Sequence, residues 1–343
     1  MAACAERIGA EGGPGRLLPA LALLACLLLL GGCATRTEMI GPVRQSPALA
    51  DRVLVATDGV ALPLRRWEPA GPPRAVIVAL HGFNDYSNAF DAPARDWAAE
   101  GIVTLAYDQR GFGAAPGRGL WPGINTLQAD LLSAIAAARQ TYPGIPVFVL
   151  GESMGGAVAA ATLAGAPLPD GVGGLILSAP AVWSRATMPF YQRWALAIGG
   201  WLFPGMELTP PKGLKIQASD NIEMLRALGR DPMIIRATRI DAMRGLTDLM
   251  DQAMASMARL PSPTLMLYGR NEQVIPPVAV ATALGRLPPG DGVRVLRYPD
   301  GWHLLLRDLK ADIVRGDVVA FVKDPARPPP GGLPVASAME TGL

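Results

Sequence analysis

An apolar run that leads straight into a glycine-rich turn is the strongest constraint on how this chain can fold. Residues 146–150 read PVFVL, and residues 151–156 continue as Gly-Glu-Ser-Met-Gly-Gly before an alanine-rich helical pattern. This places a G-x-S-x-G sequence between a predicted strand and a predicted helix, which favours a sharp turn that lifts the serine out of the sheet. Ser153 is therefore a candidate nucleophile. The alternative is a glycine-rich turn in which the serine is incidental.

The rest of the chain alternates short apolar runs with helical patterns, which is typical of a parallel sheet with crossover helices. The predicted strands are residues 52–57, 60–67, 75–80, 102–107, 146–150, 174–178, 264–268 and 293–298. The predicted helices include residues 125–140, with Asn125 as the cap, and residues 311–322. We therefore predict an α/β fold with a mostly parallel central sheet and helices on both faces.

Residues 183–258 interrupt this alternation, because they carry helical patterns and no strand signal. An insertion of this size between two strands predicts a helical cap, which divides the sheet domain into residues 51–182 and 259–324. The cap holds eight of the thirteen methionines, which suit a pocket for flexible chains. Its uncharged run, residues 194–204, has two interpretations: a buried helix on the core, or an acyl tunnel or membrane-touching lid. The proline-rich residues 325–343 are predicted to be disordered.

The N-terminal residues 1–32 have the pattern of a signal peptide, since an arginine precedes the uncharged apolar residues 17–32. The sequence Leu-Gly-Gly-Cys that ends at Cys33 resembles the lipobox of bacterial lipoproteins, in which the cysteine carries the lipid. The resemblance implies a lipid-anchored protein of the bacterial cell envelope, on the outer membrane facing the periplasm, with residues 33–50 as a tether. An ordinary signal peptide or an N-terminal membrane anchor is the alternative.

Composition excludes several classes of function. A net charge of +2 gives no basis for binding nucleic acid. The chain has two histidines and three cysteines, and all the cysteines lie in the first 33 residues, so a zinc site built on several such ligands is excluded. We predict no metal and no organic cofactor. The oligomeric state is left open.

A serine hydroxyl needs an adjacent base, and only His81 and His303 can supply one. His303 follows the last predicted strand, which is where the order of nucleophile, acid and base places it, so His81 is assigned as a loop brace. The acid should follow the preceding strand, 264–268, and Glu272 is the only carboxylate in that loop. Asp300 is the alternative acid, although so tight a turn seldom brings a carboxylate under the ring.

Attack on a carbonyl also needs N–H donors for the negative charge that develops on its oxygen. We predict that the backbone N–H groups of Phe83 and Met154 form this oxyanion hole. Phe83 lies in the loop after a predicted strand, and Met154 directly follows Ser153. Asp108 and Arg110, which follow another strand, are interpreted as braces of their own loop.

Together these motifs resemble the monoacylglycerol lipase and lysophospholipase branch of the α/β-hydrolases, also described as serine aminopeptidase-like. The residues that carry the resemblance, between about residues 50 and 323, are His81-Gly82-Phe83, residues 108–113, residues 151–156, Glu272 and His303. The resemblance implies an α/β-hydrolase fold, with a Ser153 nucleophile and a His303 base. Glu272 stands where that family usually has aspartate. Glutamate is longer by one methylene, so its loop must lie slightly farther from His303.

The resemblance further implies a serine carboxylesterase that cleaves small acyl esters, such as monoacylglycerol or lysophospholipid-like lipids, through an acyl-serine intermediate. One alternative is a peptidase or amidase of the same fold, in which an acidic residue of the cap anchors a peptide N-terminus. The acidic residues of the cap are Glu207, Asp220, Glu223, Asp231, Asp241, Asp248 and Asp251. The other alternative is a non-catalytic envelope binding protein, which has no need of the complete set Ser153, Glu272 and His303.

Overall fold

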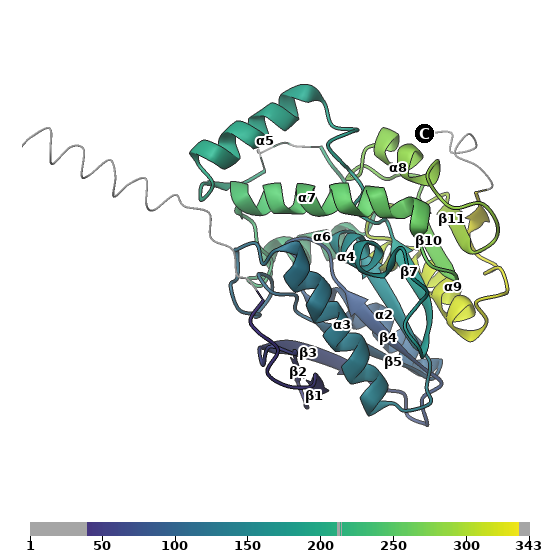
Figure 1. The fold of residues 1–343 in the computed structure, drawn as a ribbon. Helices are drawn as coiled ribbons and strands as arrows, with labels where there is room; N and C mark the ends of the chain where they lie inside the picture. Colours follow the sequence, from purple (N-terminus) through teal and green to yellow (C-terminus); the bar gives the residue numbers. More distant parts are fainter. Residues whose placement is uncertain (1–39, 211–212, 214, 336–343) are drawn as a thin grey trace, which may run out of the picture.

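The computed structural model describes residues 40–210, 213 and 215–335, and a ten-stranded sheet forms its centre (Figure 1). In spatial order the strands are β1 (Ala48–Leu49), β2 (Val53–Val55), β3 (Ala61–Trp67), β5 (Ile102–Tyr107), β4 (Ala75–Leu80), β6 (Val147–Glu152), β7 (Val172–Ser178), β10 (Thr264–Gly269), β11 (Val293–Tyr298) and β12 (Leu333–Pro334). The central strands from β5 to β11 are parallel. The pairs at the two edges are antiparallel.

Helices cover the sheet on both faces, which confirms the predicted α/β architecture. The helices of the sheet domain are α2 (Asp91–Ala99), α3 (Ile124–Thr141), α4 (Met154–Leu163), α8 (Pro277–Leu284) and α9 (Ala311–Lys323), with short 3-10 helices η2 (Ser87–Phe90), η3 (Met257–Arg259) and η4 (Leu305–Arg307). Side chains of α3, α4 and α8 belong to one hydrophobic core, and those of α2 and α9 to the other.

Strand β4 shows why its sequence is apolar at every position. Successive side chains of a strand point to opposite faces of the sheet. Val76, Val78 and Leu80 belong to the core beneath α3 and α4, whereas Ala75, Ile77 and Ala79 belong to the core beneath α2 and α9. All six residues are buried, as expected for a parallel strand that is covered on both faces.

The predicted strands of the sheet are confirmed, with ends that move by up to two residues. The opening hairpin turns at Asp58-Gly59, where Gly59 has a φ of 84°, a conformation that favours glycine. The prediction that Asn125 is the N-cap residue of α3 is wrong. Gly123, with a φ of 83°, precedes the helix, so Asn125 lies inside its first turn and makes no cap.

Two short strands lie in segments for which the sequence predicted none. Ala48–Leu49 pairs with β2, so the predicted tether of residues 33–50 ends in the sheet. Leu333–Pro334 pairs with β11, so the predicted disordered tail of residues 325–343 is ordered at this point. The buried carboxylate of Asp317 explains the second strand, because it accepts the N–H groups of Gly331 and Gly332 at 2.7 and 2.8 Å. Cys33 and the predicted signal segment, residues 1–32, lie outside the described residues.

The predicted cap consists of α5 (Phe190–Leu202), α6 (Ile222–Arg230) and α7 (Ile240–Ser256). Two strands of two residues each, β8 (Glu207–Leu208) and β9 (Thr238–Arg239), pair within it, which the sequence did not predict. Helix α7 packs on α4, and α5 lies above α7 (Figure 1).

The buried-helix interpretation of residues 194–204 is wrong. Helix α5 approaches α7 through its glycines: a Cβ on Gly199 would lie 3.5 Å from the side chain of Ile240, and Gly200 is the buried residue of α5. The large side chains point outward, and Trp194 and Trp201 are 65 % and 79 % exposed. Within the described part of the chain, no helix has the length and apolar character needed to cross a bilayer.

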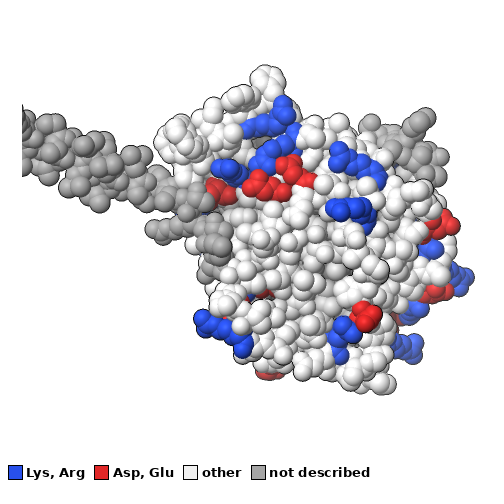
Figure 2. Space-filling model, in the orientation of Figure 1, with Lys and Arg blue, Asp and Glu red and all other residues white. Residues whose placement is uncertain are grey.

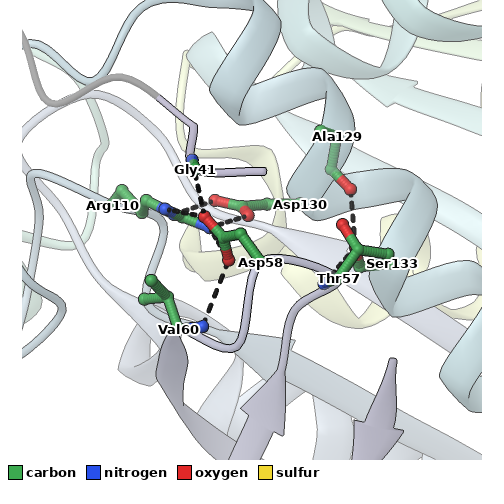
Figure 3. A network of polar contacts seen from close by, with 8 residues as sticks. All are labelled: Gly41, Thr57, Asp58, Val60, Arg110, Ala129, Asp130 and Ser133. Carbon is green, nitrogen blue, oxygen red and sulfur yellow. Dashed lines mark hydrogen bonds and ion pairs between the residues drawn. The ribbon is translucent and has the colours of Figure 1, made fainter. Parts of the chain in front are cut away.

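A buried arginine joins the turn of the opening hairpin to helix α3 (Figure 3). Arg110 follows β5, and its guanidinium donates to both carboxylate oxygens of Asp58 at 2.7 and 2.9 Å and to both of Asp130 at 2.9 and 2.8 Å. Asp58 lies in the hairpin turn and Asp130 in α3, so Arg110 joins three segments. These contacts support its interpretation as a structural brace.

Replacing Arg110 with methionine should lower the free energy of unfolding by about 3–5 kcal/mol, because two buried carboxylates would lose their partner. Urea denaturation measures the change. The control is Arg95→Met, since Arg95 is 69 % exposed in its pair with Asp91 and such pairs contribute about 0–1 kcal/mol. Equal losses in the two variants would contradict the assignment of Arg110 as a brace.

Candidate active site

Ser153 lies in a strained turn between β6 and α4. Its φ of 53° is rare for a residue with a side chain. The turn is closely packed: a Cβ on Gly151 would lie 2.3 Å from the Gly155 carbonyl oxygen, and a Cβ on Gly155 would lie 2.2 Å from that of Leu80. Glycine is therefore required at both positions. The Ser153 N–H donates to the Ser178 oxygen at 2.9 Å, which ties the turn to the neighbouring strand β7.

The structure brings the three predicted residues into one hydrogen-bonded chain. Ser153 Oγ lies 3.0 Å from His303 Nε2, and His303 Nδ1 lies 2.7 Å from Glu272 Oε2. The second carboxylate oxygen of Glu272 accepts the N–H groups of Val274 and Ile275 at 2.6 and 3.0 Å. These two bonds fix the carboxylate, so glutamate fits the position despite its extra methylene. His303 and Glu272 are buried, and Ser153 is half-buried.

The surroundings of His303 shift the pKa of its ring. Burial acts to lower the pKa of His303, but the charge and hydrogen bond of Glu272 outweigh it and raise the pKa above its usual value. Burial acts to raise the pKa of Glu272, whereas His303 and the two backbone N–H groups lower it below its usual value. Glu272 is therefore ionised and able to stabilise an imidazolium at His303.

His81 is placed as a brace beneath the loop of Phe83. Its Nδ1 lies 2.8 Å from the Gly82 oxygen, and its Nε2 accepts the Gln109 N–H at 3.0 Å. Burial lowers the pKa of His81, so the ring is neutral and donates from Nδ1. A Cβ on Gly82 would lie 3.5 Å from the Cβ of Ser153, so this loop runs beside the serine.

The backbone N–H groups of Phe83 and Met154 therefore come from the two segments that flank Ser153. Met154 begins α4, and the N-terminus of a helix favours negative charge. The ring of Phe83 packs edge-on against Phe112 at 5.5 Å. Asp108 holds the neighbouring loop, since its carboxylate accepts the N–H groups of Ser87 and Ala114 at 2.9 and 2.8 Å.

Asp300 is not part of this arrangement. Its carboxylate is exposed and pairs with Lys310 at 2.6 Å. The structure thus brings Glu272 to His303 and leaves the alternative acid on the surface. No group of three or more side chains with metal-ligand chemistry gathers within the described residues.

Sequence reasoning missed the polar contacts that hold the loop of His303. Leu304 donates its N–H to the Ala218 oxygen of the cap at 2.9 Å, and Ser219 Oγ donates to Asp308 Oδ1 at 2.6 Å. The other oxygen of Asp308 accepts the Trp302 N–H at 2.7 Å. Burial raises the pKa of Asp308 to about 6. The cap is thus bonded directly to the loop that carries His303, and no periodicity in the sequence signals such contacts.

Solved structures with the same architecture establish the fold class. A monoacylglycerol lipase from Paleococcus ferrophilus superposes with a TM-score of 0.62 at 20 % identity, over 76 % of this chain and 98 % of that one. A thermostable carboxyl esterase from Bacillus coagulans superposes with a TM-score of 0.65 at 20 % identity, over 79 % and 96 %. At this identity the likeness shows the fold alone, which is that of the α/β-hydrolases.

The sequence places the chain within that fold. The family described as serine aminopeptidase, S33, matches residues 71–310, and the chain belongs to it. A monoacylglycerol lipase of Mycolicibacterium smegmatis is 27 % identical over 284 residues, which cover 81 % of this chain and 98 % of the relative. A monoglyceride lipase of Homo sapiens is 27 % identical over 259 residues, which cover 75 % and 84 %.

The strain at Ser153 predicts an unusual order of stabilities. Ser153→Gly should be more stable than Ser153→Ala by about 1 kcal/mol, because glycine adopts the positive φ without a steric penalty. Both variants lack the hydroxyl, so thermal unfolding of the pair isolates the backbone strain. Ala160→Gly, at a buried position within α4, is the control and should destabilise by more than about 0.5–1 kcal/mol, because it loses a buried methyl group as well as helix propensity. If Ser153→Gly were the less stable of the pair, the turn would hold no such strain.

Proposed function

We propose that the protein is a serine carboxylesterase that hydrolyses acyl-lipid esters through an acyl-serine intermediate. The observation that carries the proposal is the continuous chain from Ser153 Oγ through His303 to Glu272, with separations of 3.0 and 2.7 Å. Such a chain activates a hydroxyl that is otherwise a weak nucleophile. It also argues against a non-catalytic binding protein, which does not require these contacts.

In the proposed reaction, Ser153 Oγ attacks the ester carbonyl carbon while His303 Nε2 takes the hydroxyl proton. The resulting oxyanion accepts hydrogen bonds from the N–H groups of Phe83 and Met154. Each donor of this kind typically contributes about 3 kcal/mol to lowering the barrier. His303 then gives its proton to the leaving alcohol, which leaves Ser153 acylated. Water attacks the acyl group with His303 as base, and the carboxylic acid leaves as the serine is restored.

A lipid substrate is supported by the relatives and by the surface of α5. The relatives described above are named as monoacylglycerol or monoglyceride lipases. The surface over α5 is mostly uncharged, with a mixed cluster of basic and acidic side chains beside it (Figure 2). Its exposed apolar residues are Phe190, Tyr191, Trp194, Ile198, Trp201, Leu202 and Phe203. Aromatic side chains of this kind suit the interface between water and a lipid layer.

The predicted lipid anchor at Cys33 agrees with this picture. We propose that the anchor holds the enzyme at the bacterial outer membrane, facing the periplasm. Six residues separate Cys33 from the first described residue, Ile40. The anchor would therefore keep the domain close to the lipid layer that supplies its substrate.

A peptidase of the same fold is the second candidate, because the family carries the description serine aminopeptidase. Such an enzyme needs a carboxylate that is available to bind a peptide N-terminus. Most acidic residues of the cap are already engaged. Asp248 and Asp251 pair with Arg185, Asp241 pairs with Arg239, Asp231 accepts the hydroxyl of Tyr86, and Asp220 accepts the Leu309 N–H. These contacts favour the esterase.

The proposal predicts that a fluorophosphonate probe labels the protein at Ser153 and that Ser153→Ala abolishes both labelling and ester hydrolysis. Gel fluorescence measures labelling, and aryl esters of increasing chain length measure turnover. Aminoacyl amides serve as the competing substrates. A wild-type protein that is not labelled would not be an enzyme of this kind. Faster turnover of amides than of every ester would favour the peptidase.

The same assays test the role of α5 in reaching a lipid surface. Trp201→Ser should slow hydrolysis of monoacylglycerol in phosphatidylcholine vesicles and leave hydrolysis of a soluble aryl ester unchanged. The exposed Leu132→Ser, on α3, is the control, because Leu132 is also exposed but lies outside the cap. Equal rates of vesicle hydrolysis for the two variants would contradict a role of α5 in contacting the membrane.

The activity should fall as the pH drops, because His303 accepts a proton only when it is neutral. Glu272 raises the pKa of His303, so the acid limb of kcat/KM should have its midpoint above about 6.5, the usual histidine value. Glu272→Gln should lower kcat on the order of 10³-fold or more, because the ring loses its orienting carboxylate.

Asp300→Asn is the matched control for Glu272→Gln. Asp300 is exposed and contacts Lys310, so this change should leave both kcat and the pH midpoint unaltered. A large loss in Asp300→Asn with little loss in Glu272→Gln would transfer the acid role to Asp300.

A further inference from the structure

One buried arginine connects the loops that carry the proposed catalytic groups. Arg307 lies in η4, in the same loop as His303, and is 9 % exposed. A single guanidinium nitrogen, Nη2, donates to Asp85 Oδ2 at 2.8 Å and to Glu152 Oε1 at 2.6 Å. The carbonyl oxygen of Arg307 accepts the side-chain amide of Asn221, from the cap, at 3.1 Å.

Each carboxylate that Arg307 binds belongs to a different part of the proposed site. Glu152 is the last residue of β6 and directly precedes Ser153. Asp85 closes the turn that carries Phe83, because its backbone N–H donates to the Gly82 oxygen at 3.2 Å. The side chain of Arg307, from the loop of His303, therefore holds both the turn of Ser153 and the loop of Phe83.

We propose that Arg307 is a positioning residue, which fixes the loop of His303 against Ser153 by bridging Glu152 and Asp85. The inference rests on the proposed function. It adds a residue that does not touch the substrate and lies outside the hydrogen-bonded set of Ser153, His303 and Glu272. Arginine suits this role because its planar guanidinium directs several donors at once and stays charged when buried. Loss of geometry at a catalytic group by about 1 Å can cost on the order of 100-fold in rate.

The bridge also sets the charge around His303. Two carboxylates share one arginine, so the buried cluster carries a net negative charge. Burial acts to lower the pKa of His303, whereas Glu272 raises it; Glu152 raises it to a smaller extent, and Arg307 acts to lower it. The charged and titratable groups packed around the loop of His303 include Glu272, Glu152, Asp85, Arg307, Asp308, Asp220 and Arg315, with the exposed pair Asp300 and Lys310 beyond them.

Three variants test the proposal with kcat, KM and the pH profile for p-nitrophenyl butyrate. Arg307→Gln should lower the plateau kcat at least about tenfold with KM changed less than about twofold, because the reacting groups lose alignment while the substrate surface stays intact. Arg307→Lys should retain more activity than Arg307→Gln, since it restores the charge. Glu152→Gln should move the acid midpoint to lower pH, because it removes a negative charge near His303.

Arg110→Lys is the matched control, because Arg110 is also buried between two carboxylates but contacts neither His303 nor the loop of Phe83. It should lower the melting temperature without moving the pH midpoint or the plateau. A folded Arg307→Gln with wild-type kcat, or Glu152→Gln with an unmoved midpoint, would overturn the proposal. If Arg307→Gln does not fold, the midpoint of Glu152→Gln decides alone.

Fluorophosphonate labelling of the wild type separates this inference from the function on which it rests. Absence of labelling would defeat the proposed function itself. Normal labelling of the wild type, combined with unchanged kinetics in the folded Arg307 and Glu152 variants, would defeat only the role of Arg307.

Discussion

Close backbone packing around one serine is the constraint on which the rest of this structure depends. Gly151 and Gly155 have no space for a side chain, because the backbone of the turn lies against Leu80 and against itself. This packing holds Ser153 at a positive φ beside the loop that follows β4, and His303, in the loop after β11, reaches its hydroxyl. The parallel order of the central strands then brings the carboxyl ends of several strands to one edge of the sheet. The hydroxyl of Ser153, the carboxylate of Glu272 and the ring of His303, which are distant in sequence, meet there as a consequence.

The parts of the fold that follow from side-chain periodicity were predictable. Strand β4 is apolar at all six positions because both faces are covered, and that pattern is visible in the sequence. Ser153, His303 and Glu272 could be placed together because each follows a predicted strand of a parallel sheet. The predictions failed where single contacts decide the structure. The bonds from Asp317 to Gly331 and Gly332 order a segment whose proline content suggested disorder.

Helix α5 shows a different limit of sequence reasoning. An uncharged run of eleven residues, 194–204, has the same composition whether it packs in a core or faces outward. The structure resolves the choice because the small residues Gly199 and Gly200 face α7 and the tryptophans do not. Exposed apolar surface of this extent commonly marks a contact with a membrane or a partner. Periodicity alone could not distinguish these cases, since it does not say which face of a helix meets the protein.

The two histidines show how the surroundings of a side chain, rather than its type, determine its chemistry. Both rings are buried. His81 is held by the Gly82 oxygen and the Gln109 N–H, a pattern that suits a neutral ring, and burial lowers its pKa. His303 meets an ionised carboxylate on one side and a hydroxyl on the other, and its pKa is raised. A proton on the ring is therefore more stable at His303 than at His81. The pKa values of the two buried rings therefore shift in opposite directions, because a carboxylate lies within hydrogen-bonding distance of His303 whereas backbone groups hold His81.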